Sequence, residues 1–171
     1  MPNLHLLRHA KSSWKADTED HERPLNKRGR ETADVVGRHL RGAVGQLDLV
    51  LCSSARRTRQ TLELLLAALS AQPRCMVEDG LYLADCATLL NRLKRFDETV
   101  VNVLLIGHNP GLQELATALA KPDSPGAAAL ADGKFPTAAC ASFDIRTSWS
   151  ALGDTRHRLV DYVTPASLAR R

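Results

Sequence analysis

Residues 4–14 read Leu4-His5-Leu6-Leu7-Arg8-His9-Ala10-Lys11-Ser12-Ser13-Trp14, an apolar run that gives way abruptly to polar residues. The leucines predict a short buried strand. The strand ends in Arg8-His9, so a guanidinium and an imidazole enter the polar loop that follows. In a parallel sheet, ligands usually bind in the crevice outside the carboxyl ends of the strands. This stretch therefore predicts a binding site at the end of the first strand.

Two further apolar runs are followed by similar polar and basic side chains. The run 49–52 is followed by Ser53 and by a cluster of arginines at positions 56, 57 and 59, and the run 100–106 is followed by Gly107-His108-Asn109-Pro110. If these strands are parallel, their ends meet at one edge of a sheet. The pattern then predicts a pocket with two imidazoles and at least two guanidiniums, without an obvious metal-binding carboxylate. This donor set suits a phosphoryl group, and we expect neither a metal nor a cofactor.

The composition indicates one globular unit. With 171 residues, of which 44% are hydrophobic, the chain can bury one sizeable core, and we expect a single domain over 1–171 with a polar tail at 164–171. The sequence has neither a membrane-spanning apolar run nor a secretory signal pattern, so we expect a cytoplasmic protein that does not bind membranes. The net charge of +4 fits an anionic substrate, whereas 4% aromatic residues argue against nucleic acid. We expect a monomer.

The cysteines do not indicate a disulfide framework or a nucleophile. Cys52, Cys75, Cys86 and Cys140 have no C-x-x-C spacing, so we interpret them as reduced thiols. Cys52 precedes the arginine cluster, but a cysteine phosphatase loop needs an arginine six positions after its cysteine. Thr58 stands there, so we reject Cys52 as a nucleophile.

Strand and helix patterns alternate through the first two-thirds of the chain. This alternation predicts an α/β fold, a three-layer α/β/α sandwich with a mostly parallel central sheet. The expected strands are 4–7, 47–52, 74–78, 100–106, 137–145 and 157–163. The run 100–106 is almost entirely apolar, which is typical of a central strand buried on both faces.

The expected helices follow from capping residues and apolar spacing. Asn26 is the predicted N-cap of a helix over 28–40 that Gly42 and Gly45 end, and Ser53 or Ser54 is the predicted cap of the next helix. Further helices are expected over 85–95 and from 108 to about 120. We expect 15–23 to be a loop over the site and 121–136 to be a flexible loop.

Five motifs, in this order, resemble those of the histidine phosphatase superfamily, also called the phosphoglycerate-mutase-like family. They are Leu7-Arg8-His9-Ala10-Lys11, Arg23-Pro24-Leu25 with Gly29, Ser53 with Arg57, Gln60 and Thr61, Gly107-His108-Asn109-Pro110, and Phe135-Pro136-Thr137. More narrowly, the chain resembles the small SixA-type phosphohistidine phosphatases. The resemblance covers most of the chain and implies the phosphoglycerate-mutase-like form of the α/β/α sandwich.

The resemblance also implies roles for particular residues. It makes His9 the nucleophile, with Arg8, Arg57 and His108 as the other catalytic residues that bind phosphoryl oxygens. It selects Arg57 over Arg56, because Arg57 lies four residues after Ser53 and three before Gln60. Asn109 is expected to offer its backbone N–H. Further candidates for the phosphate pocket are Lys11, Ser12 and His21. Gln60 and Thr61 are expected to support the helix.

One departure from the family concerns the proton donor. Many relatives have a general-acid glutamate where this chain has Leu83. Nearby carboxylates are Glu78, Asp79 and Asp85, and whether one of them acts as an acid stays open. An imidazole leaves phosphohistidine with less help than an alkoxide leaves a sugar phosphate. The absent acid therefore favours phosphohistidine.

The predicted function is hydrolysis of a phosphoryl group, in the first place from phosphohistidine on a signalling or phosphotransfer protein, through a phospho-His9 intermediate. We expect the surrounding cations to keep His9 neutral and nucleophilic, and His108 to stay protonated against the phosphate. A small-molecule phosphomonoesterase or mutase of the same superfamily is the second alternative. A phosphate-binding module without turnover is the third. Accordingly, the expected partner is a phosphohistidine-bearing protein or a small phosphorylated substrate.

Overall fold

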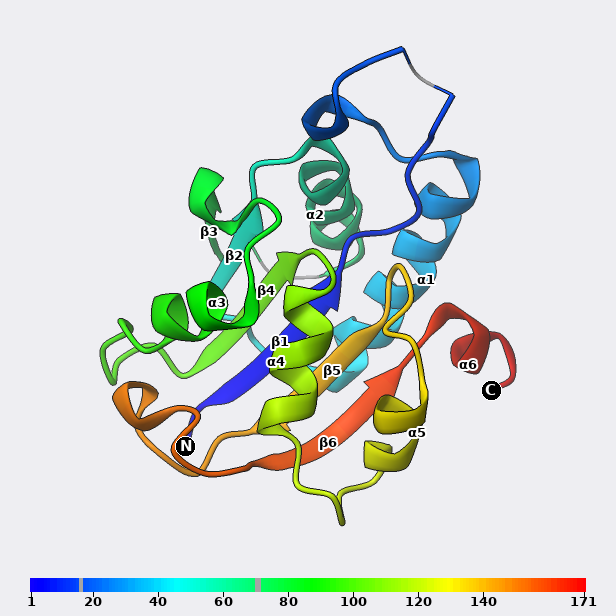
Figure 1. The fold of residues 1–171 in the computed structure, drawn as a ribbon. Coiled ribbons are helices and arrows are strands. Elements are labelled where there is room, and N and C mark those ends of the chain that lie inside the picture. Colours follow the sequence, from blue (N-terminus) through cyan, green and yellow to red (C-terminus); the bar gives the residue numbers. More distant parts are fainter. Residues whose placement is uncertain (16, 70–71) are drawn as a thin grey trace.

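A computed structural model describes residues 1–15, 17–69 and 72–171, and it contains a six-stranded sheet with helices on both faces (Figure 1). The strands are β1 (Asn3–Arg8), β2 (Leu49–Ser53), β3 (Arg74–Glu78), β4 (Asn102–Gly107), β5 (Cys140–Asp144) and β6 (Arg158–Val163). Their order in the sheet is β3-β2-β4-β1-β5-β6. The pairs from β3 to β1 are parallel, and β5 runs antiparallel to both of its neighbours. The predicted mostly parallel α/β/α sandwich is confirmed.

The helices divide between the two faces of the sheet (Figure 1). One face carries α1 (Lys27–Ala43), α2 (Arg56–Ala68) and α6 (Pro165–Ala169), and the other carries α3 (Cys86–Leu93), α4 (Gly111–Leu119) and α5 (Ala127–Asp132). Short 3-10 helices are η1 (Asp20–Glu22), η2 (Asp79–Leu81) and η3 (Trp149–Ala151). Within the described part of the chain, no helix has the length and apolar character needed to cross a membrane.

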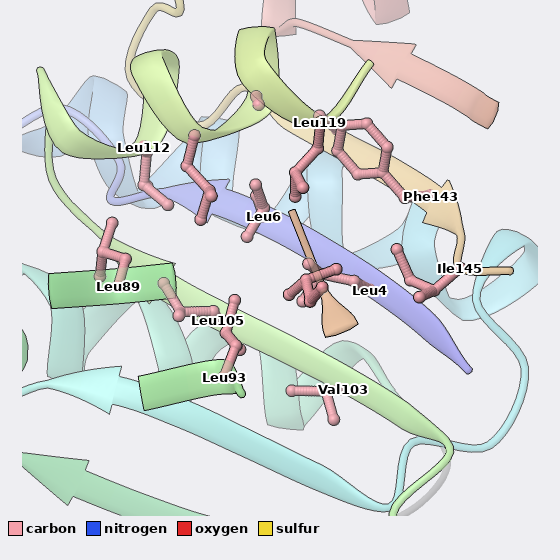
Figure 2. Close-up of a cluster of buried hydrophobic side chains, with 14 of the residues drawn as sticks. Leu4, Leu6, Leu89, Leu93, Val103, Leu105, Leu112, Leu119, Phe143 and Ile145 are labelled. Carbon is pink, nitrogen blue, oxygen red and sulfur yellow. The ribbon is translucent and has the colours of Figure 1, made fainter. Parts of the chain in front are cut away.

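Two hydrophobic cores lie on opposite faces of the sheet because successive strand side chains point in opposite directions. Leu4 and Leu6 of β1 enter the core under α3 and α4, where Figure 2 shows them with Leu105 and Leu112. Leu7 enters the other core, with residues of α1 and α2. The central strands are therefore apolar on both faces, as a buried parallel sheet requires.

The carboxyl ends of β1, β4 and β2 lie side by side. Arg8 pairs in register with Gly107, and Cys52 pairs with Ile106. The residues that follow these strands, His9 and His108, and the last residue of β2, Ser53, therefore reach the same edge. The shared edge predicted from the sequence is confirmed.

The start of α1 packs closely against the loop that follows β1. Asn26 caps the helix as predicted, because its side-chain oxygen accepts from the backbone N–H of Gly29 at 2.8 Å. A Cβ on Gly29 would lie 2.0 Å from the carbonyl oxygen of Lys11. Glycine is thus required here by the close approach of two backbones. The helix continues through Gly42, and Gly45, with φ +65°, lies beyond its end.

Three local predictions were wrong. The segment 121–136 was predicted to be a loop, but its alanines and Leu130 form α5. Leu130 is buried in the hydrophobic core that lies under α3 and α4. The tail 164–171 contains α6, which begins with a capping box between Thr164 and Ser167. Neither Ser53 nor Ser54 caps α2, whose N-cap position is Ala55; the Ser53 hydroxyl instead binds His108.

Candidate active site

A pocket of about 390 Å³ lies at the carboxyl edge of the parallel strands. Its lining comprises Arg8, His9, Lys11, Ser12, Trp14, Asp20, Arg23, Arg57, Leu83, His108, Asn109 and Thr137. Of the predicted site residues, only His21 is not part of this lining. A larger hollow of about 780 Å³ beside β3 and α3 contains none of the predicted site residues.

His9 is buried and held as a neutral imidazole. Its Nδ1 donates to the Ala10 carbonyl at 2.7 Å, which directs Nε2, as an acceptor, toward Arg57 Nε at 3.3 Å. Burial lowers the pKa of His9 to about 3, and the neighbouring Arg57 and Arg8 guanidiniums act in the same direction. The expected neutral state therefore arises first from desolvation and only second from neighbouring cations.

Arg57 connects the two imidazoles to the loop over the site. It lies in the first turn of α2, as predicted, and is 2% exposed. Its Nη2 lies 3.3 Å from His108 Nδ1 and 3.2 Å from Asp20 Oδ2, and its Nη1 donates to the Asp20 carbonyl at 2.8 Å. The neighbouring Arg56 and Arg59 are exposed, since adjacent helical residues diverge by about 100°.

His108 is neutral in this arrangement, and its expected protonation against a phosphate stays a prediction. Its Nδ1 accepts from Arg57, so Nε2 carries the proton and donates to the Ser53 hydroxyl at 2.7 Å. Burial and the adjacent Arg57 guanidinium lower the pKa of His108 to about 3. The sequence did not reveal that Arg57 would face His108 as well as a phosphoryl group.

Arg8 and Asn109 share an anchor on the segment before β5. Arg8 Nη1 and Asn109 Nδ2 both donate to the Phe135 carbonyl, at 3.0 and 2.8 Å. Arg8 Nε and Asn109 Oδ1 are buried and have no hydrogen-bond partner among the described residues. The carbonyl therefore orients the Arg8 guanidinium at the end of β1.

Arg23 and Thr137, which were quoted only as motif residues, also line the pocket, and Asp20 is the acidic residue there to which no sequence motif pointed. Its carboxylate accepts from Arg57, from Arg23 Nε at 3.1 Å and from the Tyr82 hydroxyl. The bond from Tyr82, with those from Arg23 and Arg57, lowers the pKa of Asp20 to about 2. The only available signal was a carboxylate three residues before Arg23-Pro24, within the loop expected to cover the site.

The carboxylates that the sequence offered as possible proton donors lie outside the pocket. Glu78 pairs with Arg92 at 2.7 Å, and Asp85 caps α3 by accepting from Thr88 N–H at 2.8 Å. Neither they nor Asp79 line the pocket, whereas Leu83 does. Among the described residues, Asp20 is the only carboxylate in the lining.

The remaining candidates have distinct positions. Ser12 is buried and accepts from Arg23 Nη1 at 2.8 Å, and Lys11 is exposed at the pocket. His21 instead bonds through Nε2 to the Ser54 hydroxyl at 2.9 Å, outside the lining. As expected, Gln60 and Thr61 support the scaffold: Gln60 accepts from Leu25 N–H at 2.8 Å, and Thr61 accepts from Ala10 N–H at 3.0 Å.

Comparisons with known proteins agree with this geometry. Residues 4–81 match the model of the histidine phosphatase superfamily, branch 1. An uncharacterised protein of Mycobacterium tuberculosis is 33% identical over 161 residues, which cover 93% of this chain and 99% of that protein. A solved structure described as a SixA phosphohistidine phosphatase of Nakamurella multipartitia superimposes with a TM-score of 0.83 at 27% identity, covering 96% of each chain. The structure of the protein histidine phosphatase SixA complexed with tungstate has a TM-score of 0.78 at 25% identity, covering 97% of this chain and 99% of that one.

Proposed function

This chain belongs to the histidine phosphatase superfamily, and we propose that it is a phosphatase that removes the phosphoryl group from phosphohistidine on a protein. The observation that carries the substrate assignment is the state of Asp20. It is the only carboxylate lining the described pocket, and its pKa of about 2 keeps it ionised near neutral pH. A pocket without a protonated carboxyl group favours a leaving group that does not need such an acid.

The first chemical step is an in-line transfer to His9. The Nε2 lone pair forms a bond to phosphorus as the phosphorus–nitrogen bond of the substrate breaks. The electron pair of the broken bond goes to the substrate imidazole, which leaves as neutral imidazole when its other ring nitrogen carries a proton. The Ala10 carbonyl, which accepts from Nδ1 at 2.7 Å, stabilises the positive charge that develops on the His9 ring.

The cations of the pocket stabilise the transferring group. Its negative charge is spread over equatorial oxygens, which Arg8 and Arg57 meet with donors already oriented by Phe135 and Asp20. An incoming dianion also raises the pKa of His108, so that this imidazole gains a proton and becomes a further donor. Tungstate, which is bound in a SixA structure, is a tetrahedral oxyanion like phosphate and supports such a site.

The second step returns the enzyme to its starting state. A water oxygen attacks the phosphorus of phospho-His9, the bond to Nε2 breaks, and phosphate leaves. Nε2 recovers its lone pair. Both steps use the same guanidiniums, because the charge distribution on phosphorus is similar in each.

The experiment compares wild type with His9→Ala on a phosphohistidine protein and on a panel of sugar phosphates. Rapid quenching traps any acid-labile phosphoenzyme. We expect wild type to dephosphorylate phosphohistidine selectively and to form a phosphoenzyme, and His9→Ala to lose both. His39→Gln is the matched control, because His39 lies outside the pocket and pairs with Asp161.

Three results would contradict the proposal in different ways. Retention of most activity by His9→Ala would exclude the nucleophile. Faster turnover of a sugar phosphate would make the protein a small-molecule phosphomonoesterase or mutase. Phosphate binding without turnover or a phosphoenzyme would make it a phosphate-binding module.

A further inference from the structure

Two large apolar side chains stand exposed at the mouth of the phosphate pocket. Trp14 is 80% exposed and Leu83 is 54% exposed, and both line the same pocket as His9 and Arg57. They come from separate segments, one between β1 and α1 and the other between η2 and α3, which both lie at the upper edge of the sheet in Figure 1. Single exposed apolar residues need no explanation, but a pair placed on the rim of a cationic pocket marks a binding surface.

Trp14 is held in place although it is almost fully exposed. The Arg23 guanidinium carbon lies 3.5 Å from the centroid of the Trp14 ring, the geometry of a cation–π contact. Arg23 is itself 7% exposed and is anchored by the Ser12 hydroxyl at 2.8 Å and by Asp20 at 3.1 Å. The Trp14 indole is therefore packed against an ordered guanidinium, that of Arg23. A preorganised aromatic ring loses little entropy when a partner covers it.

Leu83 is held at the pocket by an unfavourable backbone conformation. Its φ is +50°, a left-handed value that is uncommon for a non-glycine residue. Glycine would adopt this conformation without strain, yet the chain carries a large apolar side chain here.

The chemistry between these two side chains defines the ligand. The lining contributes the cations Arg8, Arg23, Arg57 and Lys11 against one carboxylate, Asp20, so the inner part of the pocket complements an anion. At the mouth of the pocket, two separate segments contribute the apolar side chains of Trp14 and Leu83. A phosphorylated imidazole combines both properties, because a dianionic phosphoryl group is joined to a flat ring with apolar faces.

Resting on the proposed function, we propose that Trp14 and Leu83 form a clamp that binds the phosphorylated imidazole and the apolar protein surface around it. The clamp sets the preference for a phosphohistidine-bearing protein over small phosphorylated molecules. Trp14 supplies a rigid aromatic contact, and Leu83 supplies an aliphatic contact from a separate segment. Neither side chain donates or accepts a proton, so both act on substrate binding and leave the transfer itself to His9.

The test measures kcat and KM for Trp14→Ala and Leu83→Gly on two substrates. One is a phosphohistidine-bearing protein, and the other is phosphoramidate, which has the same phosphorus–nitrogen bond but no ring. We expect the ratio of kcat/KM for the protein to kcat/KM for phosphoramidate to fall at least tenfold, mainly through KM for the protein. Val160→Ala removes an exposed apolar side chain, 46% exposed, that is not part of the pocket lining, and it should leave this ratio unchanged.

The outcomes separate the clamp from the proposed function. If wild type hydrolyses the phosphohistidine protein, but Trp14→Ala and Leu83→Gly keep the wild-type ratio of kcat/KM for the protein to kcat/KM for phosphoramidate, the clamp is excluded. The proposed function then stands. If the variants lose activity equally on both substrates, the side chains only support the pocket, and the clamp is again excluded. If wild type hydrolyses neither substrate, the proposed function fails and the clamp fails with it. Circular dichroism of each variant checks that the fold is retained.

Discussion

Arg57 Nε donates to His9 Nε2 across 3.3 Å. The contact keeps the nucleophilic nitrogen unprotonated, and it also occupies the lone pair that would attack phosphorus. In the proposed reaction, a phosphoryl oxygen takes over the Arg57 donor and releases that lone pair. In that reaction, the same guanidinium protects the nucleophile before substrate binds and stabilises the charge on phosphorus afterwards.

Replacing Arg57 with lysine should lower kcat strongly. A single ammonium cannot reproduce the forked contacts to His9, His108 and Asp20, and loss of one preorganised donor typically costs about 10²–10³-fold in kcat. Steady-state kinetics on a phosphohistidine protein measures the effect. Arg56→Lys, on the next residue of α2, is the control and should change kcat less than about twofold. Similar activities for the two variants would refute the role of Arg57.

Asp20→Asn should reduce activity by misplacing arginines, not by removing an acid. The carboxylate holds Arg57 and Arg23, and hydrogen bonds to charged groups are worth about 1.5–3 kcal/mol, so we expect kcat/KM to fall about 10- to 100-fold. Because the pKa of Asp20 is about 2, the pH profile between pH 5 and 8 should keep its shape. Glu19→Gln, in the same loop, is the control. If the wild-type pH profile falls at high pH and this fall disappears only in Asp20→Asn, Asp20 would instead be identified as a proton donor.

Gly29→Ala and Gly42→Ala, in the same helix, should change stability in opposite directions. The new Cβ at position 29 would lie 2.0 Å from the Lys11 carbonyl oxygen, so we expect a loss of about 1–3 kcal/mol or more in the free energy of unfolding. At Gly42 the added methyl meets no atom within 4 Å, and we expect a gain of about 1 kcal/mol. Urea denaturation measures both. Activity should fall only for Gly29→Ala, because the displaced backbone belongs to the loop after His9.

Stability should fall as the pH is lowered from 6.5 toward 4. The pKa values of His5, His9 and His108 are lowered by burial to about 4, 3 and 3, so in this window the unfolded chain binds protons that the folded chain does not. Each imidazole then contributes a slope of about 1.4 kcal/mol per pH unit, with stability lost toward acid pH.

Urea denaturation at several pH values tests this linkage. His9→Gln should be less sensitive to acid than wild type, with a slope about 1.4 kcal/mol per pH unit smaller. Val160→Ala removes no titratable group, retains His5, His9 and His108, and should keep the wild-type slope. An identical slope in wild type and His9→Gln would mean that His9 is not held neutral by the fold.

Part of the fold and part of the candidate site could be predicted from local sequence alone. Strand edges and helix starts depend on short-range patterns, so the apolar run of β4, the Asn26 cap, the six strands and helices α1 to α4 were predicted correctly. The same patterns placed His9, Arg57 and His108 at one edge of the sheet, because the carboxyl ends of parallel strands necessarily meet there.

Only the tertiary structure decided how these groups act on one another. Asp20 lies in a loop without periodicity, and its contact with Arg57 joins residues 37 positions apart, which no local pattern encodes. The neutral state of His108 depends on burial and on the position of Arg57, and the rim of Trp14 and Leu83 depends on two segments meeting over one pocket. Local sequence determines which side chains leave each strand, whereas desolvation and long-range contacts determine their charge and their partners.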